Sequence, residues 1–320
     1  MKKVLVTGGC GFIGSHFIRY LVENHRDLLV INIDKLTYAG SRENLKDIEG
    51  HDRYHFIHGD ICDEDLVASI LREGIHYVIN FAAETHVDRS IISSRPFVET
   101  NVLGTQVLLD CSLKFGVEKY IQISTDEVYG SLPLGSGEPF TEETPLAPGN
   151  PYSASKAGAD FLVMSYYRTH GLPAIITRCS NNYGEYQYPE KLIPKTILNA
   201  LKDEPVEVYG DGLNVRDWIY VKDHCSAVFK AMERGVPGEV YNIGAGCEVS
   251  NIEIVKAILR ILNKPDSLIQ YVKDRPGHDR RYAMNSAKIR RELKWHPETD
   301  FMEGLMKTVR WYQQNEGRWK

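Results

Sequence analysis

Long apolar runs, paired cysteine motifs and a surplus of either charge are all missing from this 320-residue sequence. No stretch approaches the roughly 20 apolar residues of a membrane span, and the run after Met1 is shorter than a signal-peptide core. With 38 basic and 43 acidic residues the formal net charge is −5, which argues against nucleic acid or an anionic membrane as a partner. The six cysteines form no CxxC pair, so we expect neither a disulfide framework nor a zinc site, and we expect a cytoplasmic location.

The composition is that of an ordinary folded protein, with 42% hydrophobic and 25% charged residues, and the length suggests about two domains. Through the first half, short apolar runs alternate with segments of helical period. The predicted strands are Lys3–Thr7, Leu28–Ile33, Tyr54–His58, Tyr77–Phe81, Lys119–Ser124 and Ala174–Arg178. The predicted helices include Ile13–Asn24, Glu64–Glu73, Val98–Phe115 and a long helix from Ser153. This alternation predicts an α/β fold built on a Rossmann-type, doubly wound parallel sheet.

The regular alternation of strands and helices stops after Arg178, which predicts a smaller, mixed α/β C-terminal domain that binds the substrate. Residues 181–190 are rich in Tyr, Asn and Gly and are expected to form an irregular loop at a site. We expect a dinucleotide-binding domain over 1–180, with segments near 214–245 returning to it, and a substrate domain mainly over 181–320. A metal site is not expected, because His55 and His58 point to opposite faces of one predicted strand.

A glycine pattern, Gly8-x-x-Gly11-x-x-Gly14, follows the first predicted strand and opens the first helix. Glycines at such a bend let the backbone approach a pyrophosphate, which then lies on the N–H groups of the helix start. Asp34 ends the second strand, where a carboxylate binds the adenosine ribose hydroxyls and repels a 2′-phosphate. The pattern therefore predicts NAD as cofactor, although Lys35 and Arg42 leave NADP open.

Tyr152 and Lys156 are four residues apart and so share one face of a predicted helix. A tyrosine titrates near pH 10, and we expect the Lys156 ammonium and a nicotinamide ring to lower its pKa. After a Rossmann-type start, this Tyr-x-x-x-Lys pattern resembles the catalytic base of the extended short-chain dehydrogenase/reductase superfamily.

Thr125-Asp126-Glu127 lies at the carboxyl end of the fifth strand, the edge where such sheets bind ligands. A plain redox enzyme needs only the hydroxyl there. Two adjacent carboxyl groups suit a reaction with a second proton abstraction and a proton donation. The alternative to a catalytic role is a solvent-exposed turn that carries two acidic residues.

These motifs occur in order with four further stretches, and together they resemble the dTDP-glucose 4,6-dehydratase family over nearly the whole chain. The further stretches are residues 81–90, 209–212, 216–218 and 275–282. Three features depart from the family pattern: Cys10 in the glycine turn, Glu185 in place of a proline, and a short segment Ser131–Pro139.

The resemblance implies that dTDP-glucose is converted to a 4-keto-6-deoxy sugar by transient oxidation at carbon 4. Tyr152 would take the 4-hydroxyl proton, Glu127 the carbon 5 proton, and Asp126 would protonate the departing 6-hydroxyl. Thr125 would hydrogen-bond the 4-oxygen, and Lys156 would bind the nicotinamide ribose and tune Tyr152.

The resemblance also assigns binding residues. The expected cofactor site comprises Gly8, Gly11, Phe12, Ile13, Gly14, Asp34, Lys35, Thr37, Asp60, Ile61, Phe81, Ala82, Ala83, Thr100, Tyr152, Lys156 and Asn182. The expected nucleotide-sugar site comprises Thr85, Thr125, Asn181, Lys191, Leu192, Tyr209, Arg216, Asn251, Arg275 and His278. The arginines suit a diphosphate, which needs fixed cationic donors. Without the resemblance, Arg275–Arg281 would be read as a charged surface loop.

Alternatives remain open at this point. The substrate could be UDP-glucose, the reaction could be a nucleotide-sugar 4-epimerisation, or the chain could be a non-catalytic NAD-binding scaffold. Relatives pair the helices Val98–Phe115 and Ser153–Thr169 across a two-fold axis, so we expect a homodimer. Their apolar faces could instead pack only on their own sheet.

Overall fold

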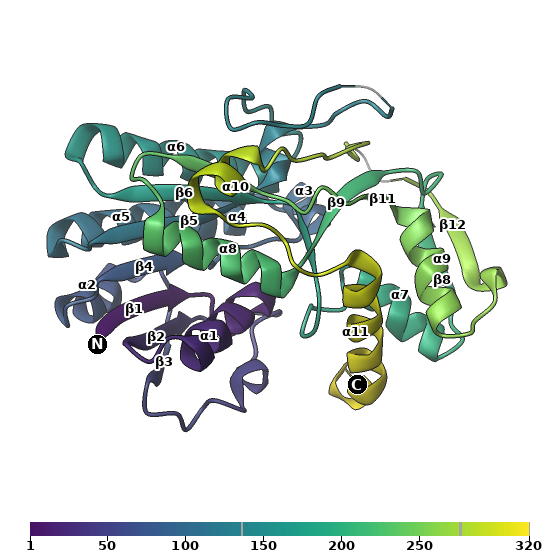
Figure 1. Cartoon of the computed structure of the whole chain (residues 1–320), viewed down its shortest axis with the longest axis horizontal. Helices are drawn as coiled ribbons and strands as arrows, with labels where there is room; N and C mark the ends of the chain where they lie inside the picture. Colours follow the sequence, from purple (N-terminus) through teal and green to yellow (C-terminus); the bar gives the residue numbers. More distant parts are fainter. Residues whose placement is uncertain (136, 275–276, 320) are drawn as a thin grey trace.

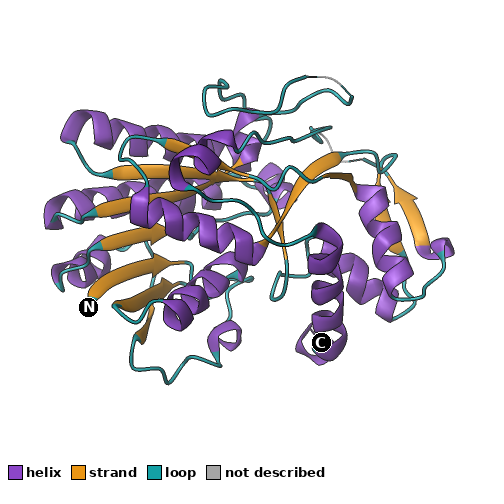
Figure 2. Ribbon diagram, viewed as in Figure 1, coloured by secondary structure: helices purple, strands orange, loops and turns teal. Residues whose placement is uncertain are grey.

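The computed structural model describes residues 1–135, 137–274 and 277–319, and a seven-stranded sheet forms its larger body (Figures 1 and 2). The strands run in the order β10-β6-β5-β4-β1-β2-β3, and every neighbouring pair is parallel. Their bounds are β1 Lys2–Thr7, β2 Leu28–Asp34, β3 Tyr54–His58, β4 Tyr77–Asn80, β5 Lys119–Thr125, β6 Ala174–Cys179 and β10 Val240–Ile243. The predicted Rossmann-type sheet is confirmed. Its strand order reverses between β1 and β4, which is where such sheets bind dinucleotides.

Helices cover both faces of this sheet (Figure 1). One face carries α1 (Phe12–Asn24), α8 (Val221–Arg234) and α10 (Ala287–Leu293), and the other α2 (Glu64–Arg72), α5 (Gly104–Phe115) and α6 (Pro151–His170). Strand β1 shows that both faces of the sheet are buried. Val4 and Val6 belong to the hydrophobic core on one face, and Leu5 belongs to the core on the other. Both faces of the strand are therefore apolar, as a parallel sheet requires.

Short elements lie at the carboxyl edge of the sheet. These are α3 (Val87–Ile92), α4 (Arg95–Phe97), the π-helix η2 (Val98–Leu103) and the 3₁₀ turn η3 (Asp126–Tyr129), with η1 (Arg42–Leu45) after β2. The helix predicted over Val98–Phe115 is thus split, and its first six residues form the π-helix. Such irregular turns are frequent at functional sites.

The smaller body, at the right of Figure 1, has its own sheets and core. Three strands run in the order β11-β9-β7 and two pair as β12-β8. The bounds are β7 Asn181–Tyr183, β8 Val206–Tyr209, β9 Val215–Tyr220, β11 Glu248–Ser250 and β12 Ile269–Val272, with α7 Leu192–Leu201, α9 Asn251–Ile261, α11 Phe301–Gln314, η4 Asp266–Leu268 and η5 Glu316–Trp319. Ile197, Ile258 and Leu305 pack at the centre of this core. The boundary at residue 180 stays a prediction, since the chain returns to the large sheet at β10.

Two features of this part differ from expectation. Residues 181–190 begin with a strand, β7, which pairs with β9. Helix α8 has no counterpart among the predicted elements, because β9 runs into it at Val221 with neither glycine nor proline between them to mark a boundary. Both differences matter for the site, since β7 and α8 lie beside it.

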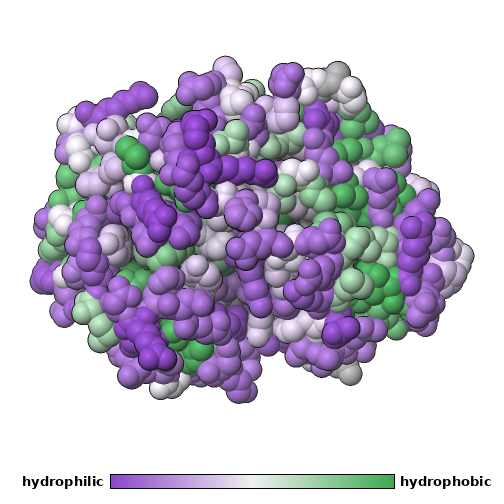
Figure 3. Space-filling model, viewed as in Figure 1, coloured by the Kyte–Doolittle hydropathy of each residue, from purple (hydrophilic) through white to green (hydrophobic). Residues whose placement is uncertain are grey.

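The surface is mainly polar on the face drawn in Figure 3, where the larger apolar patches lie over the end that carries the smaller body. None of the helices in the described part of the chain combines the length and apolar character that crossing a membrane requires.

Candidate active site

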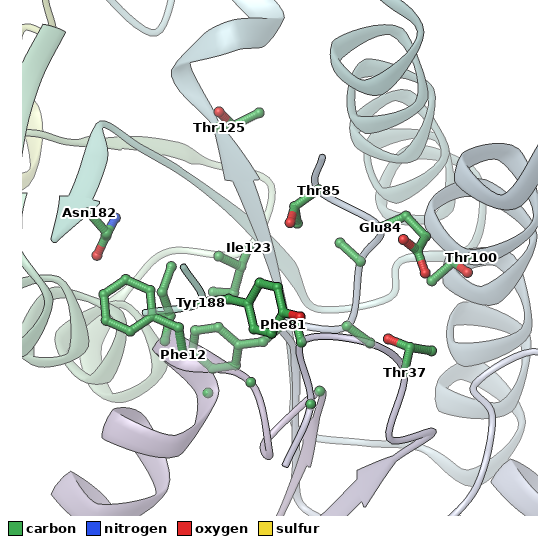
Figure 4. A pocket seen from close by; sticks show the side chains of 18 of the residues that line it. Phe12, Thr37, Phe81, Glu84, Thr85, Thr100, Ile123, Thr125, Asn182 and Tyr188 are labelled. Atoms are coloured by element: carbon green, nitrogen blue, oxygen red, sulfur yellow. The ribbon is translucent and has the colours of Figure 1, made fainter. Parts of the chain in front are cut away.

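A cavity of about 310 Å³ opens beyond the carboxyl ends of the central strands, between the two bodies (Figure 4). Every residue predicted to be catalytic or to bind the cofactor lines it. Among the predicted sugar-binding residues, Thr85, Thr125, Asn181 and Lys191 line it as well. Leu192, Tyr209, Arg216, Asn251 and His278 do not line it, and Arg275 lies outside the described residues.

The glycine turn forms the floor of the cavity, and its three glycines meet different constraints. Gly8 has a φ of 65°, and a Cβ there would lie 2.7 Å from the Ala82 Cα. A Cβ on Gly14 would lie 2.4 Å from the Gly8 oxygen, so both positions exclude a side chain. A Cβ on Gly11 would meet only the Gly8 oxygen, at 3.2 Å, and Gly11 starts α1 without a side-chain cap. The first N–H groups of α1 are therefore left for a ligand phosphate.

Asp34 lies beside this turn and is held by two backbone N–H groups. The N–H of Cys10 and the N–H of Leu36 each donate to its carboxylate at 2.8 Å, while burial raises the pKa of the group. The nearby cations are engaged elsewhere: Lys35 Nζ lies 2.6 Å from Asp60 Oδ2, and Arg42 pairs with Glu49. A 2′-phosphate would meet a carboxylate here rather than an unengaged cation, so the geometry favours NAD over NADP.

The acid pair lies where β5 turns into η3. Thr125 Oγ1 donates to Asp126 Oδ1 at 3.1 Å and accepts the Glu127 N–H at 3.2 Å. Asp126 is only 2% exposed, and its Oδ2 has no hydrogen-bond partner among the described residues, whereas Glu127 is partly exposed. Burial, reinforced by the charge of Glu127, raises the pKa of Asp126 well above its usual range. Two adjacent acids are thus placed in different environments, as an acid and a base at one pH require.

Tyr152 and Lys156 project from the first turns of α6, which a capping box of Asn150 and Ser153 starts. Lys156 Nζ donates to the Ile123 carbonyl at 2.5 Å, and burial lowers the pKa of this ammonium. Burial raises the pKa of Tyr152 well above its usual range, and the charge of Glu127 adds to this. The expected lowering of this pKa included the charge of a bound nicotinamide ring; in the protein alone, desolvation and the charge of Glu127 raise the pKa instead.

Four side chains join the smaller body to the larger one beside the cavity, and we call them the Glu190 clamp: Tyr38, His86, Arg89 and Glu190. Tyr38 Oη donates to Glu190 Oε1 at 3.2 Å. Glu190 Oε2 lies 3.5 Å from His86 Nε2 and 4.0 Å from Arg89 Nη2. The Arg89 guanidinium stacks 3.9 Å over the Tyr38 ring. The segment before α7 is therefore fastened to the loops that follow β2 and β4.

Several cavity residues were not predicted. They are Ile33, Ala39, Gly40, Gly59, Glu84, Ile123, Ser124, Cys179, Ser180, Gln187, Tyr188 and Glu190. Ser124 adjoins a recognised motif and could have been found from it. Gln187, Tyr188 and Glu190 fall within residues 181–190, the range expected to form a loop at a site, but no motif singles them out, because the path of that loop is set by contacts distant in sequence.

The remaining predicted sugar-binding residues lie on the smaller body. The Arg216 guanidinium stacks 4.3 Å over the Tyr282 ring and donates to the Asp279 carbonyl at 2.9 Å. Arg216 also lies near enough to Asp126 for its charge to oppose the rise of that pKa. His278 Nδ1 lies 2.6 Å from Asp274 Oδ1, and its ring meets the edge of Tyr209. The structure brings Arg216 toward the acid pair, with Tyr209 and His278 together in the smaller body.

Known proteins match the chain over almost its full length. A family model described as GDP-mannose 4,6 dehydratase matches residues 5–308. The low-salt glycan biosynthesis protein Agl12 of Haloferax volcanii is 52% identical, covering 97% of this chain and 98% of that protein. A dTDP-glucose 4,6-dehydratase of Escherichia coli is 48% identical, covering 99% of this chain and 95% of that protein. The crystal structure of a Bacillus anthracis dTDP-glucose 4,6-dehydratase in complex with NAD has a TM-score of 0.94 and 49% identity, covering 100% of this chain and 99% of that one. The similarity includes both bodies of the molecule.

Proposed function

The chain belongs to the GDP-mannose 4,6 dehydratase family, and from that premise we propose that it is an NAD-dependent dTDP-glucose 4,6-dehydratase. This hydro-lyase converts dTDP-glucose to dTDP-4-keto-6-deoxyglucose and water, a step in deoxysugar supply such as dTDP-rhamnose biosynthesis. One observation carries the proposal: the buried Asp126 and partly exposed Glu127 share a cavity with Tyr152 and Lys156. A dehydrogenase or an epimerase has no use for that acid pair.

The residues present fit NAD. The Gly11 position leaves backbone open to the cavity beside the uncapped start of α1, and the Asp34 carboxylate stands beside that turn. The glycine turn would hold the pyrophosphate, Asp34 the adenosine ribose, and Lys156 the nicotinamide ribose. When bound, NAD supplies the acceptor for the carbon 4 hydride and gives that hydride back at carbon 6.

The protein's own groups move the protons. Tyr152, whose pKa the positive nicotinamide ring of bound NAD would lower, takes the proton of the 4-hydroxyl while Thr125 hydrogen-bonds the same oxygen. The resulting 4-ketone acidifies the carbon 5 hydrogen, which Glu127 removes as a proton, and Glu127 protonates carbon 5 again once the hydride has reached carbon 6. Asp126 gives its proton to the 6-hydroxyl, which leaves as water. The raised pKa of Asp126 supports its role as donor, because a buried carboxyl beside Glu127 keeps its proton.

Incubation of the protein with dTDP-glucose and no added reductant tests this function. The expected product is a 4-keto-6-deoxy sugar nucleotide, seen by mass spectrometry as the loss of one water. Loss of water from UDP-glucose alone would support the UDP-sugar alternative, since thymine and uracil differ by one methyl group, worth about 1–3 kcal/mol in a pocket. A 4-epimer with no loss of water would identify an epimerase. No reaction with either nucleotide sugar would support the alternative that the chain is a non-catalytic NAD-binding scaffold.

A homodimer also belongs to this proposal. Val98 and Leu103 on η2 and Phe161 on α6 are large apolar side chains with 52%, 47% and 65% of their surface exposed. These two helical segments pack side by side, so their exposed apolar residues suit burial against a second copy. We also infer a cytoplasmic location, because all six cysteines are free thiols and four of them are buried.

A further inference from the structure

A histidine that the mechanism does not use lies directly behind the cofactor side of the cavity. His224, on the first turn of α8, has none of its surface exposed. Its Nδ1 lies 2.9 Å from the Oδ1 of Asn182, a residue of β7 that lines the cavity. In Figure 4, Asn182 lies on one side of the pocket and Thr85, Glu84 and Thr100 on the other.

The neighbouring contacts decide where the proton of the His224–Asn182 bond lies. Asn182 Nδ2 donates to the Ser180 carbonyl at 3.0 Å, and a carbonyl can only accept. The amide oxygen of Asn182 must therefore face His224, which has to donate from Nδ1. Burial lowers the pKa of His224 to about 3, so the ring stays neutral and carries its one proton on Nδ1.

The second ring nitrogen shows that this contact is costly to keep. Within the described part of the chain, His224 Nε2 has no hydrogen-bond partner. A buried polar atom without a partner costs about 1–3 kcal/mol, which a leucine or phenylalanine at this place would avoid. Packing alone does not explain a histidine at this place. The hydrogen bond from its Nδ1 to Asn182 explains it better.

We propose that His224 is a positioning residue that fixes the amide of Asn182 with its N–H₂ group toward the cofactor. The histidine occupies the amide oxygen and Ser180 takes one of the two amide hydrogens, so the second hydrogen, beside the Cys179 thiol, is what Asn182 offers to a ligand. Asn182 then acts only as a donor, and its partner is an acceptor oxygen of the dinucleotide: a carboxamide, ribose or phosphate oxygen. Without His224 the amide oxygen loses its donor, and only the Ser180 carbonyl still favours this orientation over the one rotated by 180°. This inference rests on the proposed function only in taking NAD as the occupant of the cavity.

Two variants of nearly equal shape test the proposal. His224→Asn keeps an N–H donor near the position of Nδ1, whereas His224→Leu removes it, and both leave a similar cavity. With protein stripped of dinucleotide, we expect His224→Leu to weaken NAD binding about tenfold by calorimetry, and His224→Asn to stay within about twofold of the parent. Equal affinities of the two variants would overturn the proposal, because a purely structural histidine predicts equal losses. His170→Leu, an exposed change on α6, is the matched control and should leave NAD binding unchanged.

A spectroscopic measurement on the unaltered, full-length protein makes the test independent of folding. ¹⁵N NMR of the imidazole nitrogens should show His224 neutral and protonated on Nδ1 from pH 6 to 8. A proton on Nε2 would overturn the proposal even if both variants failed to fold. Neither readout depends on dehydration of a sugar, so failure of the proposed activity and failure of this inference are distinguished.

Discussion

Asp126 and Glu127 are adjacent in sequence but differ in their exposure to solvent, and the chemistry proposed for them follows from that difference. Both carboxyl groups line the cavity, but the turn at η3 leaves Asp126 buried and Glu127 partly exposed. Burial and the neighbouring charge of Glu127 raise the pKa of Asp126, so we expect Asp126 to hold its proton and Glu127 to act as the base of the pair.

Replacing Glu127 by Gln should separate oxidation from elimination. We expect oxidation at carbon 4 to survive, so that substrate still produces NADH absorbance at 340 nm, while exchange of the carbon 5 proton with solvent falls about 10²–10⁴-fold. Deuterium incorporation in D₂O, followed by NMR, measures the exchange. The exposed Glu143→Gln is the control and should exchange normally. Undiminished exchange in Glu127→Gln would show that another group is the base.

Asp217, a buried carboxyl on β9, should make the stability of the protein depend on pH. Burial raises its pKa to about 6, although the Cys247 N–H donates to it at 2.9 Å. Between pH 4 and 6 the unfolded chain has lost this proton while the folded chain still holds it, so stability falls as pH rises through that window. Relative to the parent, Asp217→Asn should gain up to about 3 kcal/mol in unfolding free energy between pH 4 and 7.

Urea unfolding at several pH values measures this difference. Asp211→Asn is the control, because Arg280 holds the pKa of this exposed carboxyl at about 2 and its titration lies below the window. A difference between Asp217→Asn and the parent that stays constant from pH 4 to 7 would contradict the account.

At the scale of elements, we expect the Glu190 clamp to retain the cofactor between the two bodies. Glu190→Gln keeps the size of the side chain and an acceptor for Tyr38, but removes the charge that faces His86 and Arg89. We expect NAD to dissociate about tenfold faster, measured by displacement with excess unlabelled dinucleotide after loading with a radioactive one. Glu207→Gln, which breaks an exposed ion pair with Lys195 away from the cavity, should not change the rate. Equal rates in the two variants would show that the clamp does not retain the cofactor.

The elements that sequence predicts well are those whose residues carry their own signal. The apolar run of β3 falls at the predicted bounds. The glycine turn, Thr125–Glu127 and the Tyr152–Lys156 pair are local patterns, and the structure brings them to one cavity. Helix α8 was missed because nothing in the sequence separates it from β9.

The contacts that complete the site could not be predicted in this way. The bond from Tyr38 to Glu190 joins residues 152 positions apart, and that from His224 to Asn182 joins residues 42 apart. Such pairs depend on how the two bodies pack, which no local pattern encodes. The rise of the Tyr152 pKa in the protein alone was not predicted for the same reason, since desolvation is a property of the packed molecule.

For the whole molecule, the exposed apolar residues of η2 and α6 predict a dimer that one substitution disrupts. Burying a phenylalanine contributes about 1.5–3 kcal/mol, and Phe161 would be buried twice in a two-fold interface. We expect Phe161→Asp to raise the dissociation constant at least a hundredfold, so that it sediments as a monomer at micromolar concentration. Met306→Asp, an exposed change on α11, should remain dimeric. A parent protein that sediments as a monomer, or a dimeric Phe161→Asp, would contradict the interface.

The central claim is that one hydride leaves carbon 4 of the sugar and returns to carbon 6 of the same molecule, while Tyr152, Glu127 and Asp126 move the protons. Substrate deuterated at carbon 4 tests it directly, with the product analysed by mass spectrometry and NMR. The account predicts one deuterium in the methyl group of the product and none at carbon 5. A methyl group without deuterium, with the label lost to solvent, would contradict it.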